Sequence, residues 1–296
     1  MDRIILALTL GLFIQGSAVA TEPHIQGQEA LTLPSPLSRY FIRIPESEAH
    51  FFSGQARMNA LDPASIKALV WNIKKALLAD WKKEFMGYGH KKDLFLLQEA
   101  YNTDLFSSTL ESFSHIRWDM GISFLYREYG NTPTGSMIGS EAEPLEVVVR
   151  HSTALEPVVK TPKSITMAKY PLKDTIKELL VISIHAINFT GLNCFKDQLA
   201  QATAEIKNHD GPVLFAGDFN THNPLRTKHL MEEMKKLGLS PVEFKNGHQR
   251  MKFAGNFLDH GFIRGLKVKH AEVYGGSVGS DHKPMVLELS LSDEIH

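Results

Sequence analysis

From Ile66 onward, apolar and polar positions alternate in two patterns along the chain. Short continuous apolar runs bounded by glycine, proline or polar residues are typical of buried strands, whereas apolar residues recurring every three or four positions indicate helices. The runs predict strands at 68–71, 93–97, 115–118, 122–126, 145–150, 158–160, 179–189, 212–217, 257–262, 268–273 and 285–289. The helical spacing predicts helices over 77–85, from a cap at Asn102 or Thr103 to Leu110, over 195–207, and over 226–237 with Gly238 as its stop. Many strands with a few helices between them predict two sheets packed face to face, with the helices outside.

The first sixty residues carry a different pattern. The segment Ile4–Ile14 is apolar apart from Thr9, and Ala18–Val19–Ala20 follows it. Such a run is too short to span a bilayer, and the small residues offer a cleavage site, so we expect a signal peptide over 1–20 that is cleaved near Ala20. An uncleaved anchor or a chance apolar start is the alternative. The expected destination is periplasmic or secreted, and the mature chain is expected to have no transmembrane segment.

Prolines interrupt residues 21–60, which we expect to be an irregular lead-in before a domain over 61–293. The chain has 296 residues, of which 43% are hydrophobic, enough for a sizeable core. Its 32 basic and 33 acidic residues give a formal net charge of −1. This balance excludes a global basic field for nucleic acid and leaves a local basic groove open. The one cysteine, Cys194, excludes an internal disulfide and is expected to be a small buried residue.

Polar residues stand at or just after several of the expected strand ends. They are Asn72, Glu99, His185, the pair Asp218 and Asn220, and the pair Asp281 and His282. Each has a structural alternative, such as a turn residue, a charge in the first turn of a helix or a core histidine. Strand ends on one edge of packed sheets converge on a cleft, however, so we expect these side chains to meet. Phosphoester hydrolysis needs these groups: carboxylates for a hard metal ion and for aiming water, an amide for orientation, and a histidine for charge on the phosphoryl oxygens.

The motifs also resemble a known family, in its order. They are Trp71–Asn72, Gln98–Glu99, His185, Gly217–Asp218–Phe219–Asn220, Leu258–Asp259–His260 and Ser280–Asp281–His282. They are similar to the motifs of the endonuclease/exonuclease/phosphatase superfamily, which has the deoxyribonuclease I-like fold, and the resemblance covers about Ile66 to Leu291. It implies an α+β, four-layer α/β/β/α sandwich of two packed mixed sheets flanked by helices. Three further stretches, Thr161–Lys163, His185–Phe189 and Leu258–Leu266, resemble the YafD-like bacterial branch.

The resemblance implies a role for each site residue. Glu99 is the main ligand of a divalent ion, Mg²⁺ with Mn²⁺ as an alternative, and Asn72 and Asp281 lie beside it. The remaining residues act on water and phosphate: Asp218 orients or deprotonates the water, Asn220 fixes Asp218 and the phosphate, His185 and His282 donate to phosphoryl oxygens, and Asp259 sets the tautomer of His282. Water attacks phosphorus in line, without a covalent enzyme intermediate.

Several positions and functions stay open. Many apurinic endonucleases carry an acid two positions after the asparagine, where this chain has Lys74. Lys163 and Arg250 are candidate contacts for substrate phosphate, with a solvated surface charge as the alternative. We expect a monomeric phosphodiesterase or nuclease acting on a nucleic acid or on a small or lipid phosphoester. The alternatives are a phosphomonoesterase, a lipid-headgroup phosphodiesterase and a non-catalytic binding module on the same fold.

Overall fold

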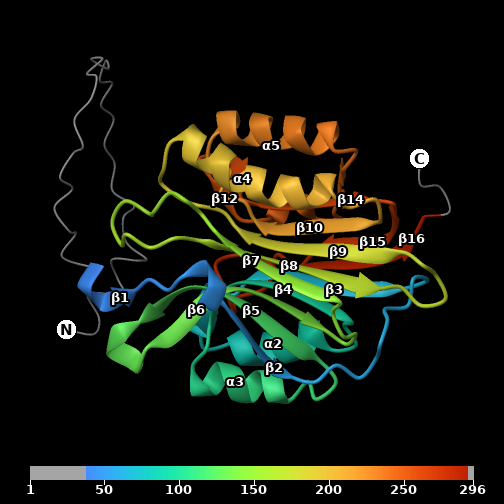
Figure 1. Ribbon diagram of the computed structural model, residues 1–296, viewed down its shortest axis with the longest axis horizontal. Coiled ribbons are helices and arrows are strands. Elements are labelled where there is room, and N and C mark those ends of the chain that lie inside the picture. The colour runs from blue at the N-terminus through green and yellow to red at the C-terminus, as the bar shows by residue number, and fades with distance from the viewer. Residues whose placement is uncertain (1–37, 293–296) are drawn as a thin grey trace. The chain divides into compact units, whose positions relative to one another are not determined.

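The computed structural model describes residues 38–292, in which two β-sheets face each other (Figure 1). The first sheet has the strand order β1-β5-β6-β4-β3-β16-β15, with β2 also paired to β5. Its strands are β1 (Phe41–Ile42), β2 (His50–Gly54), β3 (Ile66–Asn72), β4 (Leu94–Tyr101), β5 (Arg117–Tyr126), β6 (Thr132–Ser140), β15 (Leu266–Val273) and β16 (Met285–Leu291). The sheet is mixed, because β3 and β4 are parallel and the other pairs are antiparallel.

The second sheet has the order β11-β14-β10-β9-β8-β7. Its strands are β7 (Glu146–His151), β8 (Ser164–Pro171), β9 (Glu178–His185), β10 (Val213–Asp218), β11 (Ser240–Pro241) and β14 (Asp259–Arg264). Here β9 and β10 are the parallel pair. A separate two-stranded ribbon joins β12 (Lys252–Phe253) to β13 (Asn256–Phe257). Both sheets therefore place one parallel pair near their middle.

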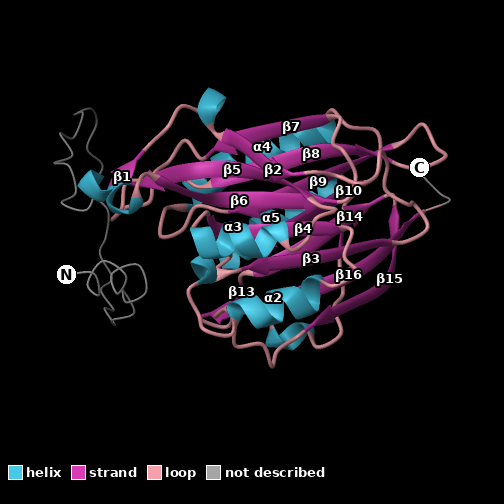
Figure 2. Ribbon diagram, turned by 90° about the horizontal axis from the view of Figure 1, so that it is seen from below, coloured by secondary structure: helices cyan, strands magenta, loops and turns pink. Residues whose placement is uncertain are grey.

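Helices cover the outer face of each sheet (Figures 1 and 2). The α-helices are α2 (Trp81–Gly89) and α3 (Asp104–Glu111) on the first sheet, and α4 (Leu192–Lys207) and α5 (Pro224–Lys236) on the second. Short 3₁₀-helices are η1 (Ser38–Tyr40), η2 (Glu46–Glu48), η3 (Lys74–Ala76), η4 (Arg127–Tyr129) and η5 (Gly247–Gln249). The expected cap of α3 is confirmed, because the Thr103 side chain accepts from the Phe106 amide. No helix within residues 38–292 has both the length and the apolar character needed to cross a membrane.

The alternation of side chains along each strand decides which layer a residue joins. Val70 of β3 and Leu214 of β10 belong to the core between the two sheets. Their neighbours Trp71 and Phe215 point the other way, toward the helices of their own sheet. The arrangement confirms the expected four-layer α/β/β/α sandwich of mixed sheets.

Most of the expected elements coincide with observed ones, and three differences lie between residues 115 and 171. The runs at 115–118 and 122–126 belong to a single strand, β5, while residues 158–160 form no strand. Strands β6 and β8 were not expected from the apolar pattern. Their inner faces carry hydroxyls that bond across the gap between the sheets: Ser136 Oγ lies 3.0 Å from Ser164 Oγ and 2.8 Å from Thr166 Oγ1.

The N-terminal expectations meet the structure only in part. Residues 38–60 fall within the expected irregular lead-in, and they include β1 and β2, both of which pair with β5. The signal peptide expected over residues 1–20 lies outside the described residues and stays a prediction.

Gly217, next to the end of β10, offers a test of how closely the strands approach there. Its φ is +145°, and a Cβ would stand 2.2 Å from the carbonyl oxygen of Ile184 on β9. We expect Gly217→Ala to lower the free energy of unfolding by about 2–4 kcal/mol, through overpacking and backbone strain. Gly87→Ala in α2 is the control, since no atom lies within 4 Å of its Cβ position; it should stabilise by up to about 1 kcal/mol. Urea unfolding curves measure both, and equal effects would contradict the close approach.

His260 of β14 is a buried histidine on the helix-facing side of the second sheet. Its ring stacks on Phe262, and its Nε2 lies 2.7 Å from Thr221 Oγ1. Burial, with the nearby Arg250 guanidinium, lowers the pKa of His260 to about 3.

This depressed pKa predicts acid lability. Between about pH 6.5 and pH 3 the unfolded chain binds a proton at His260 that the folded chain does not, so stability is present above pH 6.5 and falls with pH by at most about 1.4 kcal/mol per unit. From pH 7 to pH 5 we expect a loss of about 2 kcal/mol from this group, absent in His260→Gln and retained in His270→Gln, whose histidine is exposed. Urea unfolding at both pH values measures it. The same loss in His260→Gln as in the wild type would refute the assignment.

Candidate active site

The side chains between the two sheets are apolar along most of each strand and become polar near the carboxyl ends of the central strands. Asp218 ends β10, His185 ends β9, and Asp259 begins the antiparallel strand β14. The pairing register sets Asp218 directly beside His185 on one side and beside Asp259 on the other. Three of the expected catalytic residues therefore stand at one level across adjacent strands, and all three are buried.

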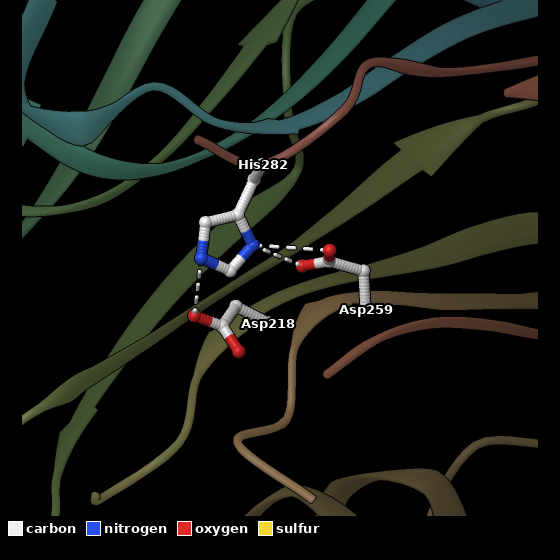
Figure 3. A group of neighbouring side chains, drawn as sticks. All are labelled: Asp218, Asp259 and His282. Carbon is white, nitrogen blue, oxygen red and sulfur yellow. Dashed lines mark hydrogen bonds and ion pairs between the residues drawn. The ribbon is translucent and has the colours of Figure 1, made fainter. Parts of the chain in front are cut away.

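The imidazole of His282 lies between two carboxylates (Figure 3). Its Nδ1 is 2.9 and 3.0 Å from the two oxygens of Asp259, and its Nε2 is 3.8 Å from Asp218 Oδ2. Burial lowers the pKa of His282, but Asp259 and Asp218 outweigh it and raise the pKa to about 10. His282 is therefore an imidazolium at neutral pH, with Nδ1–H directed at Asp259 and Nε2–H directed toward Asp218.

Asp218 is held from several sides. The Asn72 side-chain amide donates to its Oδ2 at 3.0 Å, and the Asn220 backbone N–H donates to its Oδ1 at 2.9 Å. The Asn220 side-chain amide donates to the carbonyl of Ala186 at 2.8 Å, so Asn220 also ties the turn after β10 to the end of β9. Burial raises the pKa of Asp218 to about 6 against the opposing effect of the His282 charge. A carboxylate with a raised pKa and a fixed orientation is suited to accept a proton from water.

His185 faces the same carboxylate, with its Nε2 3.6 Å from Asp218 Oδ2. Burial, followed by the charge of Lys163, holds the pKa of His185 well below its usual value. The His185 ring is thus neutral while His282 is cationic. The two histidines therefore present different protonation states to the same carboxylate.

The loop that carries Asp281 and His282 is fixed by Glu84, which the sequence motifs did not single out, together with residues of the motifs themselves. Glu84 of α2 accepts from Ser277 Oγ and from the backbone N–H groups of Val278 and Gly279. Two contacts then fix the far side of the loop: Ser280 Oγ donates to the Asn72 carbonyl at 2.7 Å, and Trp71 Nε1 donates to the His282 carbonyl at 3.1 Å. Helical spacing predicted the α2 region, but nothing local in the sequence pairs Glu84 with a loop almost two hundred residues later.

Glu99 is directed toward the site by an irregularity in β4. The pairing of β4 with β6 shifts register between Leu97 and Ala100, and Glu99 has a φ of +54°. A bulge of this kind changes the face to which a side chain points. Glu99 Oε2 forms an ion pair with Lys75 Nζ at 2.8 Å. Burial raises the pKa of Glu99, but the charges of Lys75, His185 and Lys163 outweigh burial and hold it well below its usual value.

The neighbouring lysine pairs with the other expected metal-binding carboxylate. Lys74 Nζ lies 2.8 Å from Asp281 Oδ2, and the Lys74 backbone N–H donates to Asn72 Oδ1 at 3.1 Å. Lys74, Lys75 and Ala76 all have positive φ, at 48°, 59° and 57°. Left-handed backbone costs a non-glycine residue roughly 1–2 kcal/mol, so surrounding contacts must hold this turn. In the sequence, Lys74 is notable only because many apurinic endonucleases have an acidic residue at this position, and Lys75 is not singled out.

Lys163 and Arg250 occupy different settings. Lys163 is 14% exposed and forms an ion pair with Glu156 at 3.4 Å, so it is not a solvated surface charge. Arg250 donates to the carbonyls of Gly247 and Asp259 at 2.9 and 3.0 Å, and its guanidinium lies 4.1 Å from the centre of the Phe257 ring. Its position indicates that it supports the backbone of Asp259.

Two groups of side chains come into question for a metal ion. Among residues 38–292, Asp218, Asp259 and His282 offer ligand atoms within 4.8 Å of one another. Their mutual contacts are those of hydrogen-bonded ion pairs. The expected ligands Asn72, Glu99 and Asp281 supply only oxygen donors, which suit a hard ion such as Mg²⁺. They fit it in kind, although lysine groups already contact each of them.

Comparison with known proteins identifies relatives of this chain. The model of the endonuclease/exonuclease/phosphatase family matches residues 69–282. A UPF0294 protein of Vibrio parahaemolyticus is 34% identical over 243 residues, which cover 82% of this chain and 83% of that protein.

Solved structures agree in fold. An endonuclease/exonuclease/phosphatase from Beutenbergia cavernae has a TM-score of 0.61 at 15% identity, covering 77% of this chain and 72% of that one. ANGEL2, a 2′,3′-cyclic phosphatase in complex with adenosine-2′,3′-vanadate, has a TM-score of 0.57 at 14% identity, covering 82% and 98%. The chain therefore belongs to the endonuclease/exonuclease/phosphatase family, in its YafD-like UPF0294 branch.

Proposed function

We propose that the protein is a metal-dependent phosphoester hydrolase, with a phosphodiester such as nucleic acid as its first candidate substrate. The observation that carries the proposal is the position of His282, between Asp259 and Asp218 (Figure 3). An imidazolium beside an oriented carboxylate supplies an acid and a base at one point, as water attack on phosphorus requires. Family membership supports the reaction class, because the fold binds phosphoester substrates.

Each residue has a defined part in this proposal. Asp218 takes a proton as a water oxygen forms its bond to phosphorus and the bond to the leaving oxygen breaks. His282 and His185 donate to phosphoryl oxygens, where negative charge increases in the transition state. Asp259 keeps the Nδ1 proton on His282 and so leaves Nε2–H free to donate. Asn72 and Asn220 hold the Asp218 carboxylate in place.

The ion, when bound by Glu99, Asn72 and Asp281, would neutralise a non-bridging phosphoryl oxygen. Lys163 and Lys75 add positive charge close to Glu99 and His185, which favours a substrate that carries several negative charges. The substrate class is tested by incubating the protein and Mg²⁺ or Mn²⁺ with plasmid DNA, RNA, a generic phosphodiester, a phosphomonoester and phospholipids. A nuclease would also bind more weakly as salt rises, because it displaces counterions from the polyanion.

Substitution of the two central residues tests the assignment. We expect Asp218→Asn and His282→Ala each to lower turnover by at least about 10² while the fold is kept, since each removes a group used in the transition state. Asp174→Asn and His270→Ala, at exposed positions, are matched controls that should retain wild-type turnover. Steady-state rates on the best substrate and thermal melts measure the effects. Near-wild-type turnover in either site variant would reject the assignment.

Removal of metal is a separate test. Dialysis against EDTA should abolish hydrolysis, and added Mg²⁺ or Mn²⁺ should restore it, because the phosphoryl charge would otherwise lack its main counter-ion. Initial rates before and after metal addition give the measurement. Hydrolysis that persists after exhaustive chelation would remove the ion from the proposal and leave the histidines and lysines to stabilise the phosphoryl charge.

A further inference from the structure

The three expected metal ligands are all contacted by one two-residue segment. Lys75 Nζ is 2.8 Å from Glu99, Lys74 Nζ is 2.8 Å from Asp281, and the Lys74 backbone N–H donates to Asn72 Oδ1. The lysine side chains are largely buried, with 17% of Lys75 and 18% of Lys74 exposed. The Lys75–Glu99 pair, with 23% of Glu99 exposed, is therefore not a loose surface ion pair that contributes little, whereas the Lys74–Asp281 pair is more open on its Asp281 side, which is 41% exposed.

The backbone is left-handed at both partners of the Lys75–Glu99 contact, and this conformation favours the contact. Lys74, Lys75 and Ala76 are consecutive left-handed residues without a glycine, and Glu99 is left-handed at the bulge of β4. Such conformations persist where the surroundings hold them, and they cluster at functional sites. The turn after β3 and the bulge in β4 direct the Lys75 ammonium group and the Glu99 carboxylate at each other.

The charges of these groups cancel. Glu99 and Asp281 contribute two negative charges, and Lys74 and Lys75 contribute two positive ones. A hard divalent ion is drawn to a cluster of negative oxygens, and an ammonium group on the same oxygen both repels the ion and blocks a coordination position.

We propose that Lys74 and Lys75 are built-in competitors of the divalent ion, so that a metal reaches Glu99 and Asp281 only when the ammonium groups leave these carboxylates. The inference rests on the ligand set of the proposed function and adds a property to it: the wild-type chain binds its metal weakly. The displaced lysines remain next to the ion, where they can donate to the phosphate oxygens of a substrate.

Metal binding without turnover tests this directly. The full chain, freed of metal, is titrated with Mn²⁺, and binding is followed by electron paramagnetic resonance and isothermal calorimetry. We expect Lys75→Gln and Lys74→Gln each to raise Mn²⁺ affinity at least about tenfold, which corresponds to about 1.4 kcal/mol, and the double variant to raise it further. Adding Glu99→Gln to Lys75→Gln should remove the gain, because the ion loses its carboxylate.

Two variants control for charge and for pairing. Lys75→Arg keeps a cation on Glu99 and should leave Mn²⁺ affinity within about twofold of wild type. This change is smaller than the increase of about tenfold expected when the charge is lost. Lys169→Gln breaks another lysine–glutamate pair, which has the same 2.8 Å distance to Glu146 but lies on β7 and β8. It should also leave Mn²⁺ affinity unchanged.

The outcomes separate this inference from the proposed function. Unchanged or weaker Mn²⁺ binding in Lys74→Gln and in Lys75→Gln, with native thermal melts, overturns the competition. If Lys75→Gln does not fold, Lys74→Gln decides alone, since its partner Asp281 is exposed and lies on a loop. Failure of the proposed function appears elsewhere, as an absence of metal-stimulated hydrolysis in every variant, including those that bind Mn²⁺ tightly.

Discussion

The register of β10 against its two neighbours is the constraint on which the site depends. It sets Asp218 beside His185 on the parallel side and beside Asp259 on the antiparallel side. Side chains alternate between faces, so a slip of one residue would turn Asp218 toward the helices and bring a different residue between the sheets. Gly217 permits the close approach, because the Ile184 carbonyl stands where a side chain would begin.

Pairing of buried charge is the second constraint, and it explains why the site can exist inside a sandwich. A buried ion is costly unless an opposite charge and hydrogen bonds accompany it. Asp259 and Asp218 flank His282, Lys75 neutralises Glu99, and Lys74 pairs with Asp281, which is exposed. Each charged group of this polar layer therefore has an opposite charge from the protein beside it. An incoming ion or phosphate therefore binds only by replacing some of the contacts that these groups make with each other.

The local sequence predicted those elements whose own residues are enough to indicate a helix or a strand. A helix cap such as Thr103 and a continuous apolar run such as that of β10 indicate the same local structure in almost any protein. Strand β6 could not be found in this way. The hydroxyl of its buried Ser136 is satisfied by Ser164 and Thr166 of β8, a partner from the opposite sheet, and without that partner the segment resembles a loop.

The sequence by itself determined which chemical groups the site contains and the order in which they occur, because its motifs place polar residues close to the beginnings or ends of apolar runs. Tertiary structure alone decided what those groups contact. Asn72 meets Asp218 from 146 positions away, and Lys75 meets Glu99 through left-handed backbone at both residues. Neither Lys75 nor Glu99 has glycine's freedom to adopt that backbone. The turn is therefore imposed by contacts between distant segments, and no local pattern of residues encodes it.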